Sequence, residues 1–367
     1  MTPLIGQENP EALLARALAQ DRVGHAYLLL GPSGSGKASL GVRFAAALCC
    51  SRQPAAALTG GRWRLAPCQE CESCRRVAAG THPEVVAVLP DSKTGQDISV
   101  AQARLVRQNA ALAPKLGTRR VYLLPNAEAL NEVSANALLK TLEEPAAPVT
   151  LVLCAPNPSQ VLPTIRSRCQ TVRLGLVPAA EIELGLVSRG VPTELAPALA
   201  RACGGCPGLA MTWAEDPTVL DRRRAVLDVF VAALRAQAAG QPSYGVLALR
   251  LAEQLRKLGE AEKDDEGPAR PAKVVHAQNL DLGLTFLRDL LLLRQGADPS
   301  LSQNQDRVSQ LIEMAIHAEP ARILDDIEVV REAQQLLDRN VTPQLVLERM
   351  FWALISGRIP LYEPLFD

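Results

Sequence analysis

The segment at residues 25–50 constrains the fold more strongly than any other part of the sequence. An apolar run, HAYLLL at 25–30, leads directly into the loop GPSGSGK at 31–37, and a helical pattern follows at 38–50. The loop matches the phosphate-binding pattern G-x-x-x-x-G-K-[ST] as far as its lysine. In loops of this kind, backbone N–H groups and the start of the helix surround phosphates, and the lysine reaches the terminal ones. We therefore expect a strand, a phosphate loop and a helix, with ATP or ADP as the candidate ligand. The candidate binding residues are Gly31, Gly34, Gly36 and Lys37.

Further strand-like runs follow in the first half of the chain. They are EVVAVL at 84–89, RVYLL at 120–124, VTLVLC at 149–154 and TVRL at 171–174. Helical patterns at 99–112 and 128–144 lie between them, and Pro145 ends the second pattern. Strands that alternate with helices predict βαβ units and a parallel sheet covered by helices on both faces.

The second half of the chain has a different pattern. From Pro178 onward the strand-like runs stop and helical patterns continue. Because 367 residues exceed what one hydrophobic core usually serves, we expect several domains. We predict an α/β fold plus all-α domains: a P-loop domain at 1–176, a small helical domain at 177–215 and a helical bundle at 216–367. The charged segment at 259–273 is predicted to be a solvated loop.

Charge and hydropathy restrict the partners that the chain can have. Lysine plus arginine and aspartate plus glutamate both number 39, so the chain lacks the strong basic field of a protein that binds nucleic acid alone. Any DNA contact would be local or shared with partner subunits. No cationic start precedes an apolar run, and no apolar segment reaches about 18 residues. We expect a soluble cytoplasmic protein that does not contact a membrane.

Two positions that normally support magnesium are altered. Ala38 replaces the hydroxyl residue of the phosphate loop, and Pro125 and Asn126 follow the run at 120–124, where an acidic ligand is expected. Because the metal neutralises charge that grows in the transition state, losing both supports harms phosphoryl transfer more than nucleotide binding. We expect a chain that does not hydrolyse ATP by itself, while the sequence leaves nucleotide binding open.

Four cysteines form a candidate metal site. Cys68, Cys71 and Cys74 are spaced as C-x-x-C-x-x-C, and Cys50 closes the preceding helical segment. Four thiolates suit tetrahedral Zn²⁺, and each C-x-x-C step lets neighbouring sulfurs face one ion. Cys49 competes with Cys50 for the fourth place. Because the pattern implies no open ligand position, we predict a structural zinc that holds an insertion at 50–74.

Several of these motifs, taken in order, resemble the clamp-loader branch of the AAA+ ATPases. The landmarks are IGQE at 5–8, GHAYLLLG at 24–31, the cysteine cluster followed by THPE at 81–84, NALLKTLEEP at 136–145 and RSRC at 166–169. They cover about the first 210 residues, whereas the C-terminal third matches weakly, mainly in TPQLVLERM at 342–350. The resemblance implies an AAA+ P-loop domain, a small helical lid domain and a C-terminal collar for oligomerisation.

Within that branch, departures from the motor pattern favour the delta-prime family of bacterial DNA polymerase III over the tau/gamma motor. The positions that depart are Ala38, Pro125 with Asn126, Ala155 and Gly208, the last where the motor has a sensor arginine. The motif Ser167–Arg168–Cys169 is kept. The resemblance implies that Arg168 acts in trans as an arginine finger on a neighbour's ATP. It also implies tau/gamma and delta as partners, with the sliding clamp and primed DNA engaged through the complex in DNA replication.

Two other functions remain open on the sequence. The first is a tau/gamma-type motor ATPase in which water or another carboxylate replaces the missing ligands. The second is a zinc-dependent DNA-binding protein, against which the balanced charge argues. For Arg168 itself, the alternative is an ordinary surface or salt-bridged arginine.

Overall fold

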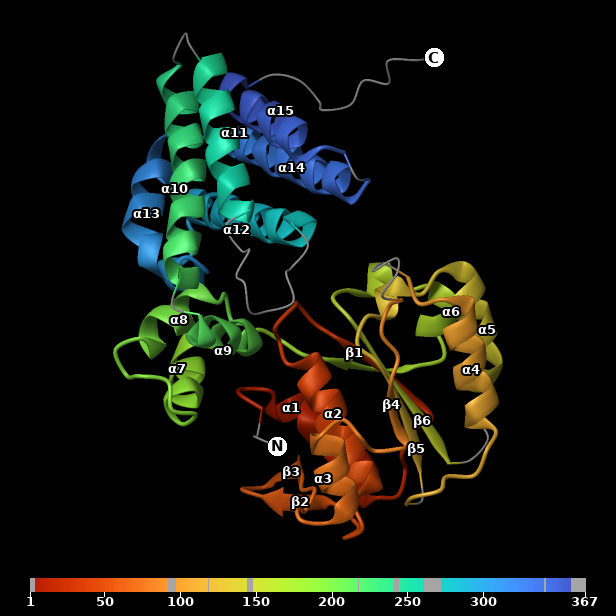
Figure 1. Cartoon of the computed structure of the whole chain (residues 1–367). Helices are drawn as coiled ribbons and strands as arrows, with labels where there is room; N and C mark the ends of the chain where they lie inside the picture. Colours follow the sequence, from red (N-terminus) through yellow and green to blue (C-terminus); the bar gives the residue numbers. More distant parts are fainter. Residues whose placement is uncertain are drawn as a thin grey trace. The chain divides into compact units, whose positions relative to one another are not determined.

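The computed structural model describes residues 4–91, 97–117, 119–143, 148–216, 218–240, 244–260, 272–339 and 341–357. It divides into two compact units (Figure 1). The first comprises Met1–Gly190 with Gly205–Met211, and the second comprises Val191–Gly204 with Thr212–Asp367. Most of the predicted solvated loop at 259–273 lies outside the described residues, as does the predicted end of the helix at Pro145.

A five-stranded parallel sheet forms the centre of the first unit. Its order is β4-β5-β6-β1-β7, and every neighbouring pair is parallel. The strands are β4 (Val85–Ala87), β5 (Arg120–Leu124), β6 (Val149–Ala155), β1 (Ala26–Leu30) and β7 (Gln170–Arg173). Every residue of β1, β5 and β6 is buried, as parallel strands covered on both faces require. The predicted parallel α/β fold is confirmed, and each strand coincides with a predicted run.

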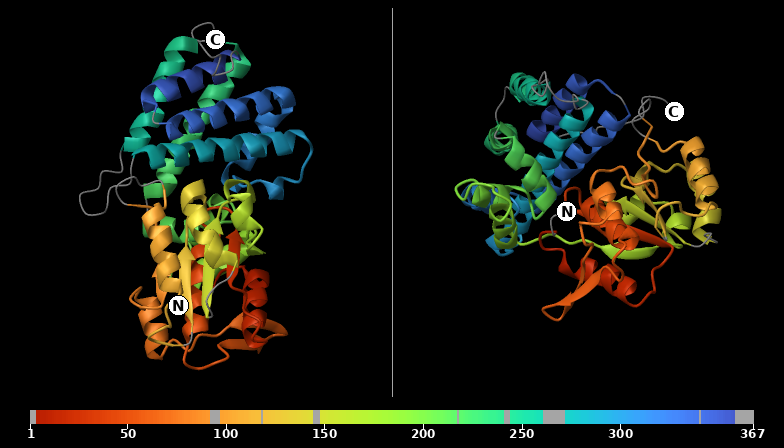
Figure 2. Two further views of the ribbon diagram at one scale, coloured as in Figure 1. Left: turned by 90° about the vertical axis from the view of Figure 1, so that its right-hand side faces the viewer. Right: turned by 60° about the horizontal axis from the view of Figure 1, so that its bottom comes forward.

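Helices cover both faces of this sheet (Figures 1 and 2). On one face, Leu29 packs with Leu14 of α1 (Glu8–Ala19) and Phe44 of α2 (Lys37–Cys49). On the other face, Leu28 belongs to a core that includes residues of α4 (Val100–Ala110) and α5 (Glu132–Glu143). Successive side chains of β1 therefore pack into the cores on opposite faces of the sheet, because side chains alternate between the two faces along a strand.

The insertion between α2 and β4 contains elements that the sequence analysis did not predict. Strands β2 (Ala56–Thr59) and β3 (Arg62–Leu65) form an antiparallel hairpin, and α3 (Glu72–Ala78) follows. Ion pairs attach the hairpin to α1. Arg64 Nη1 lies 3.0 Å from Glu11 Oε2, and Arg43 Nε of α2 lies 2.9 Å from Glu11 Oε1. Glu11 is almost fully buried, so the two arginines supply the opposite charge that a buried carboxylate needs.

The predicted small helical domain at 177–215 corresponds to α7 (Ala179–Val187), α8 (Ala196–Ala202) and α9 (Pro207–Glu215). Their residues are divided between the two units: α7 belongs to the first, α8 to the second, and α9 contains the boundary at Met211. The domain limits stay a prediction.

Helices alone build the rest of the second unit, as far as the structure describes it. They are α10 (Thr218–Ala239), α11 (Tyr244–Glu260), α12 (Ala272–Arg294), α13 (Val308–His317), α14 (Pro320–Asp338) and α15 (Pro343–Ser356), with the short turns η3 (Pro299–Leu301) and η4 (Gln305–Arg307). Phe230, Phe286 and Phe351 are fully buried in one core. The predicted helical bundle is confirmed. Among the described residues, no helix combines the length and apolar composition needed to cross a membrane.

Candidate functional site

The phosphate loop joins β1 to α2 as the sequence predicted. Gly34 and Gly36 have φ angles of +77° and +97°, a conformation that favours glycine. Lys37 Nζ turns back and donates hydrogen bonds to the carbonyl oxygens of Gly31 (2.6 Å) and Pro32 (2.8 Å). Burial lowers the pKa of Lys37, and nearby Cys154 and Glu128 oppose that effect. The lysine that should reach phosphate is thus hydrogen-bonded to its own loop.

A second segment lies directly on this loop. The backbone N–H of Gly208 donates to the Gly34 carbonyl oxygen (2.7 Å). A Cβ atom added to Gly208 would lie 2.8 Å from that oxygen, and one added to Gly34 would lie 2.6 Å from Leu209 Cγ. The position where the family resemblance expects a sensor arginine is therefore a glycine whose backbone contacts the loop.

Replacing Gly208 by Ala should lower the free energy of unfolding by about 1–2 kcal/mol. Alanine has the better helix propensity by up to about 1 kcal/mol, but a Cβ clash with backbone costs about 1–3 kcal/mol. Here the clashing Gly34 oxygen accepts the hydrogen bond of Gly208 and cannot retreat without losing it. Urea unfolding measures the change. Gly175→Ala is the control, because a Cβ there meets nothing within 4 Å. Equal midpoints for both variants would contradict the contact.

Two of the positions expected to hold magnesium have no side-chain oxygen. Ala38 is exposed in the first turn of α2, and Pro125 directly follows β5. Asn126 is exposed and donates to Glu128 Oε1 at 3.4 Å. Sequence reasoning missed Glu128 as a charge acting on Lys37, because it lies beyond the expected position, in η1 (Ala127–Ala129). The loop keeps the scaffold of a phosphate site, while these substitutions remove its usual metal supports.

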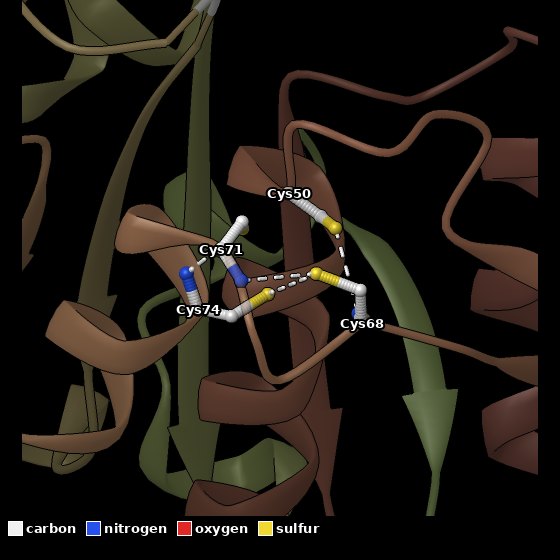
Figure 3. Close-up of side chains that lie close together, drawn as sticks. All are labelled: Cys50, Cys68, Cys71 and Cys74. Atoms are coloured by element: carbon white, nitrogen blue, oxygen red, sulfur yellow. Dashed lines mark hydrogen bonds between the residues drawn. The ribbon is translucent and has the colours of Figure 1, made fainter.

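The four predicted metal ligands come together in the insertion (Figure 3). The sulfurs of Cys50, Cys68, Cys71 and Cys74 all lie within 4.8 Å of one another. The Cys68 and Cys74 sulfurs are 3.9 Å apart. Tetrahedral ligands with zinc–sulfur bonds of about 2.3 Å would be about 3.8 Å apart, so the spacing fits one ion.

Backbone N–H groups point at three of these sulfurs. Cys71 N–H donates to Cys68 Sγ (3.3 Å), Cys74 N–H to Cys71 Sγ (3.4 Å) and Cys68 N–H to Cys50 Sγ (3.5 Å). Burial opposes ionisation of Cys71, but hydrogen bonds from Ser51 and Cys74 outweigh it and lower the pKa of Cys71 to about 6. Hydrogen bonding also lowers the pKa of Cys68, whereas burial raises those of Cys50 and Cys74. The cluster can hold a soft divalent metal.

Cys49 lies outside this cluster. It is the last residue of α2, and its sulfur contacts the Arg119 carbonyl oxygen at 3.6 Å. Burial raises the pKa of Cys49 to about 12, which keeps the thiol neutral. The backbone of Cys50 is already extended beyond the helix, which directs its side chain elsewhere. Of the two candidates for the fourth ligand, the structure places Cys50 with the other three sulfurs.

Arg168 follows the short helix α6 (Pro163–Arg166). Its Nη1 donates to the Thr164 carbonyl oxygen (2.9 Å) and to Ser167 Oγ (3.2 Å). Its Nε donates to Glu143 Oε1 (2.9 Å), as does Nη2. The side chain is 34% exposed. These partners come from α5, α6 and the turn after it, and not from the phosphate loop of the same chain.

The fold and its sites define a P-loop α/β protein that has an insertion with a four-cysteine cluster and an all-α C-terminal unit. The family model described as DNA polymerase III, delta subunit, matches residues 6–177. DNA polymerase III subunit delta' of Pseudomonas aeruginosa is 38% identical over 235 residues, which are 63% of this chain and 68% of that relative. The chain belongs to this family of DNA polymerase III delta' subunits.

Two other relatives match most of the chain. Subunit delta' of Bacillus subtilis is 27% identical over 345 residues, covering 94% of this chain and 95% of the relative. Subunit gamma/tau of Mycobacterium tuberculosis is 28% identical over 362 residues, covering 94% of this chain but 59% of the relative. The delta' relative is thus matched almost from end to end, whereas the gamma/tau relative extends well beyond the match.

Proposed function

We propose that this clamp-loader subunit does not hydrolyse ATP and supplies Arg168 in trans to the ATP of an adjacent tau/gamma subunit. Together with tau/gamma and delta, it would open the sliding clamp and place it on primed DNA in the cytoplasm. The observation that carries the proposal is the combination, in one delta' family member, of altered magnesium positions with a partly exposed Arg168 in the retained Ser-Arg-Cys motif.

The loop geometry supports a subunit that is inactive by itself. Nucleotide would have to replace the hydrogen bonds from Lys37 to Gly31 and Pro32 before the lysine could contact phosphate. Ala38 and Pro125 would then leave magnesium without two of its usual protein ligands. ATP or ADP would therefore bind more weakly here than in a motor subunit. The rate of hydrolysis would fall by a larger factor than the affinity for nucleotide.

We propose that the cysteine cluster binds structural Zn²⁺. Four thiolates complete a tetrahedral sphere and leave no position for water or substrate, which is typical of structural and not catalytic zinc. The ligands join the end of α2 to the turn before α3 and to the first turn of α3, so the metal would tie both ends of the insertion together. A zinc-dependent DNA-binding function has weaker support, because the chain carries no net charge.

The helical second unit supplies the remaining part of the proposal. Apart from α8 and the end of α9, its helices start at α10, near the predicted boundary at residue 216. We assign this bundle to the collar that holds clamp-loader subunits together, as the family resemblance implies.

ATP hydrolysis and clamp loading test this function together. The purified chain alone should release no phosphate from ATP above the rate without protein. Added to tau/gamma, delta, clamp and primed DNA, it should be required for ATP-dependent clamp loading. Turnover by the chain alone would favour the motor alternative. Salt-dependent DNA binding by the isolated chain, abolished by a zinc chelator, would favour the DNA-binding alternative.

A further inference from the structure

The hydrogen bonds of Arg168 fall into two sets. Nη1 is bound by the chain around α6, through the Thr164 carbonyl oxygen and Ser167 Oγ. Nε and Nη2 are both bound by one oxygen of Glu143, the last residue of α5. The first set holds the side chain against α6 and the turn that follows it, and the second covers one edge of the guanidinium.

The edge that Glu143 covers is one through which arginine recognises oxyanions. Two parallel N–H groups on a planar guanidinium match a carboxylate or a phosphate equally well. A carboxylate bound to Nε and Nη2 therefore occupies a place that a phosphate oxygen would take. While Glu143 is bound, this edge of Arg168 is not available to a nucleotide.

The contact is weak enough to be exchanged. The side chains of Arg168 and Glu143 are 34% and 48% exposed. An ion pair with such exposure favours the paired over the unpaired state by about twofold to fivefold. Glu143 also lies at the C-terminus of α5, where the negative end of the helix dipole disfavours a carboxylate. If Glu143 withdraws, the Nη1 hydrogen bonds still hold Arg168 in place.

We propose that Glu143 is a resident anion that competes with the neighbouring subunit's γ-phosphate for the Nε and Nη2 groups of Arg168. This inference rests on the proposed role of Arg168 in trans. Glu143 leaves the guanidinium when ATP at the subunit interface brings its phosphate into reach. Removing the charge of Glu143 therefore strengthens the engagement of ATP without removing any group that acts on the phosphate.

The test uses a complete loader in which Arg168 is the sole finger. The tau/gamma subunits carry alanine in place of their own Ser-Arg-Cys arginines, and delta, clamp and primed DNA are present. Initial ATPase rates are measured across ATP concentrations with wild-type chain, Glu143→Gln, Arg168→Ala and the double variant. Glu143→Gln should lower the ATP concentration for half-maximal rate by about twofold to fivefold, with a maximal rate within about twofold of wild type. In the Arg168→Ala background, the same change should have no effect.

A matched control is Glu253→Gln, which removes an exposed ion pair with Lys257 (2.8 Å) on α11. It should leave both kinetic parameters unchanged. A higher half-maximal concentration together with a lower maximal rate for Glu143→Gln would show that Glu143 aligns Arg168, and would overturn the competition. No change in either parameter would also overturn it. If Arg168→Ala itself changed nothing, the proposed finger would be wrong, whatever Glu143 does.

Discussion

Arg168→Ala should slow ATP hydrolysis at the tau/gamma site next to this chain by about 10³-fold to 10⁵-fold. That factor corresponds to about 4–7 kcal/mol of transition-state stabilisation. The physical reason is that a guanidinium placed against the γ-phosphate neutralises charge that spreads over its oxygens as the bond breaks. Phosphate release by the reconstituted loader in which Arg168 is the sole finger, with clamp and primed DNA, measures the effect.

Arg168→Lys separates charge from geometry in the same assay. Lysine keeps the positive charge but lacks the planar fork that binds two oxygens, so its rate should fall between alanine and wild type. Folding should survive both changes, because the exposed pair with Glu143 stabilises the chain by no more than about 1 kcal/mol. Thermal unfolding and gel filtration of the assembled loader check this. Equal turnover with arginine, lysine and alanine would exclude a finger role.

Cys71→Ser should abolish stoichiometric zinc binding and open the insertion at 50–74. Structural zinc in four-ligand sites contributes about 10–16 kcal/mol of apparent binding free energy, and a serine hydroxyl is a poor replacement for a thiolate. Cys71 also caps α3 by accepting the N–H of Cys74, and a serine hydroxyl can accept the same N–H, so the variant removes the metal ligand and keeps the helix cap. Elemental analysis measures the metal, and limited proteolysis measures the opening.

Cys49→Ser is the matched control for the metal site. Cys49 is adjacent in sequence to a ligand, yet its sulfur contacts Arg119 and not the cluster. It should retain zinc in full. The opening in Cys71→Ser should stay local, because Glu11 still binds Arg43 and Arg64 and so holds the hairpin to α1. Loader ATPase should change little. Zinc retained by Cys71→Ser, or lost by Cys49→Ser, would refute the ligand set.

The sequence predicted the sheet well because its central strands β1, β5 and β6 are buried and consist mainly of apolar residues. The hairpin of β2 and β3 was missed for the opposite reason. Most of its residues are at least partly exposed, so no apolar pattern marks it. Its attachment depends on charges from α1, with Arg64 binding Glu11 across 53 positions. A pattern within the segment could not reveal that contact.

The same distinction applies to the sites. Some of their features can be predicted from neighbouring residues, and others depend on contacts between segments distant in sequence. Three metal ligands lie within seven positions in sequence, from Cys68 to Cys74, and their spacing alone predicts the cluster. The choice between Cys49 and Cys50 depends on the residue at which α2 ends, which helical periodicity does not resolve. The bonds from Gly208 to Gly34 and from Arg168 to Glu143 join segments far apart in the chain. Such contacts follow from the folded arrangement of helices and loops.

The contacts of the phosphate loop limit how far ATP could change the conformation of this subunit. A ligand shifts a conformational equilibrium only by the difference in its affinity for the two states. Here Lys37 is hydrogen-bonded to its own loop, and Gly208 is hydrogen-bonded to Gly34, so both groups already have partners within the chain before any nucleotide binds. In an assembly whose other members cycle between nucleotide states, the phosphate loop of this chain would keep one conformation throughout.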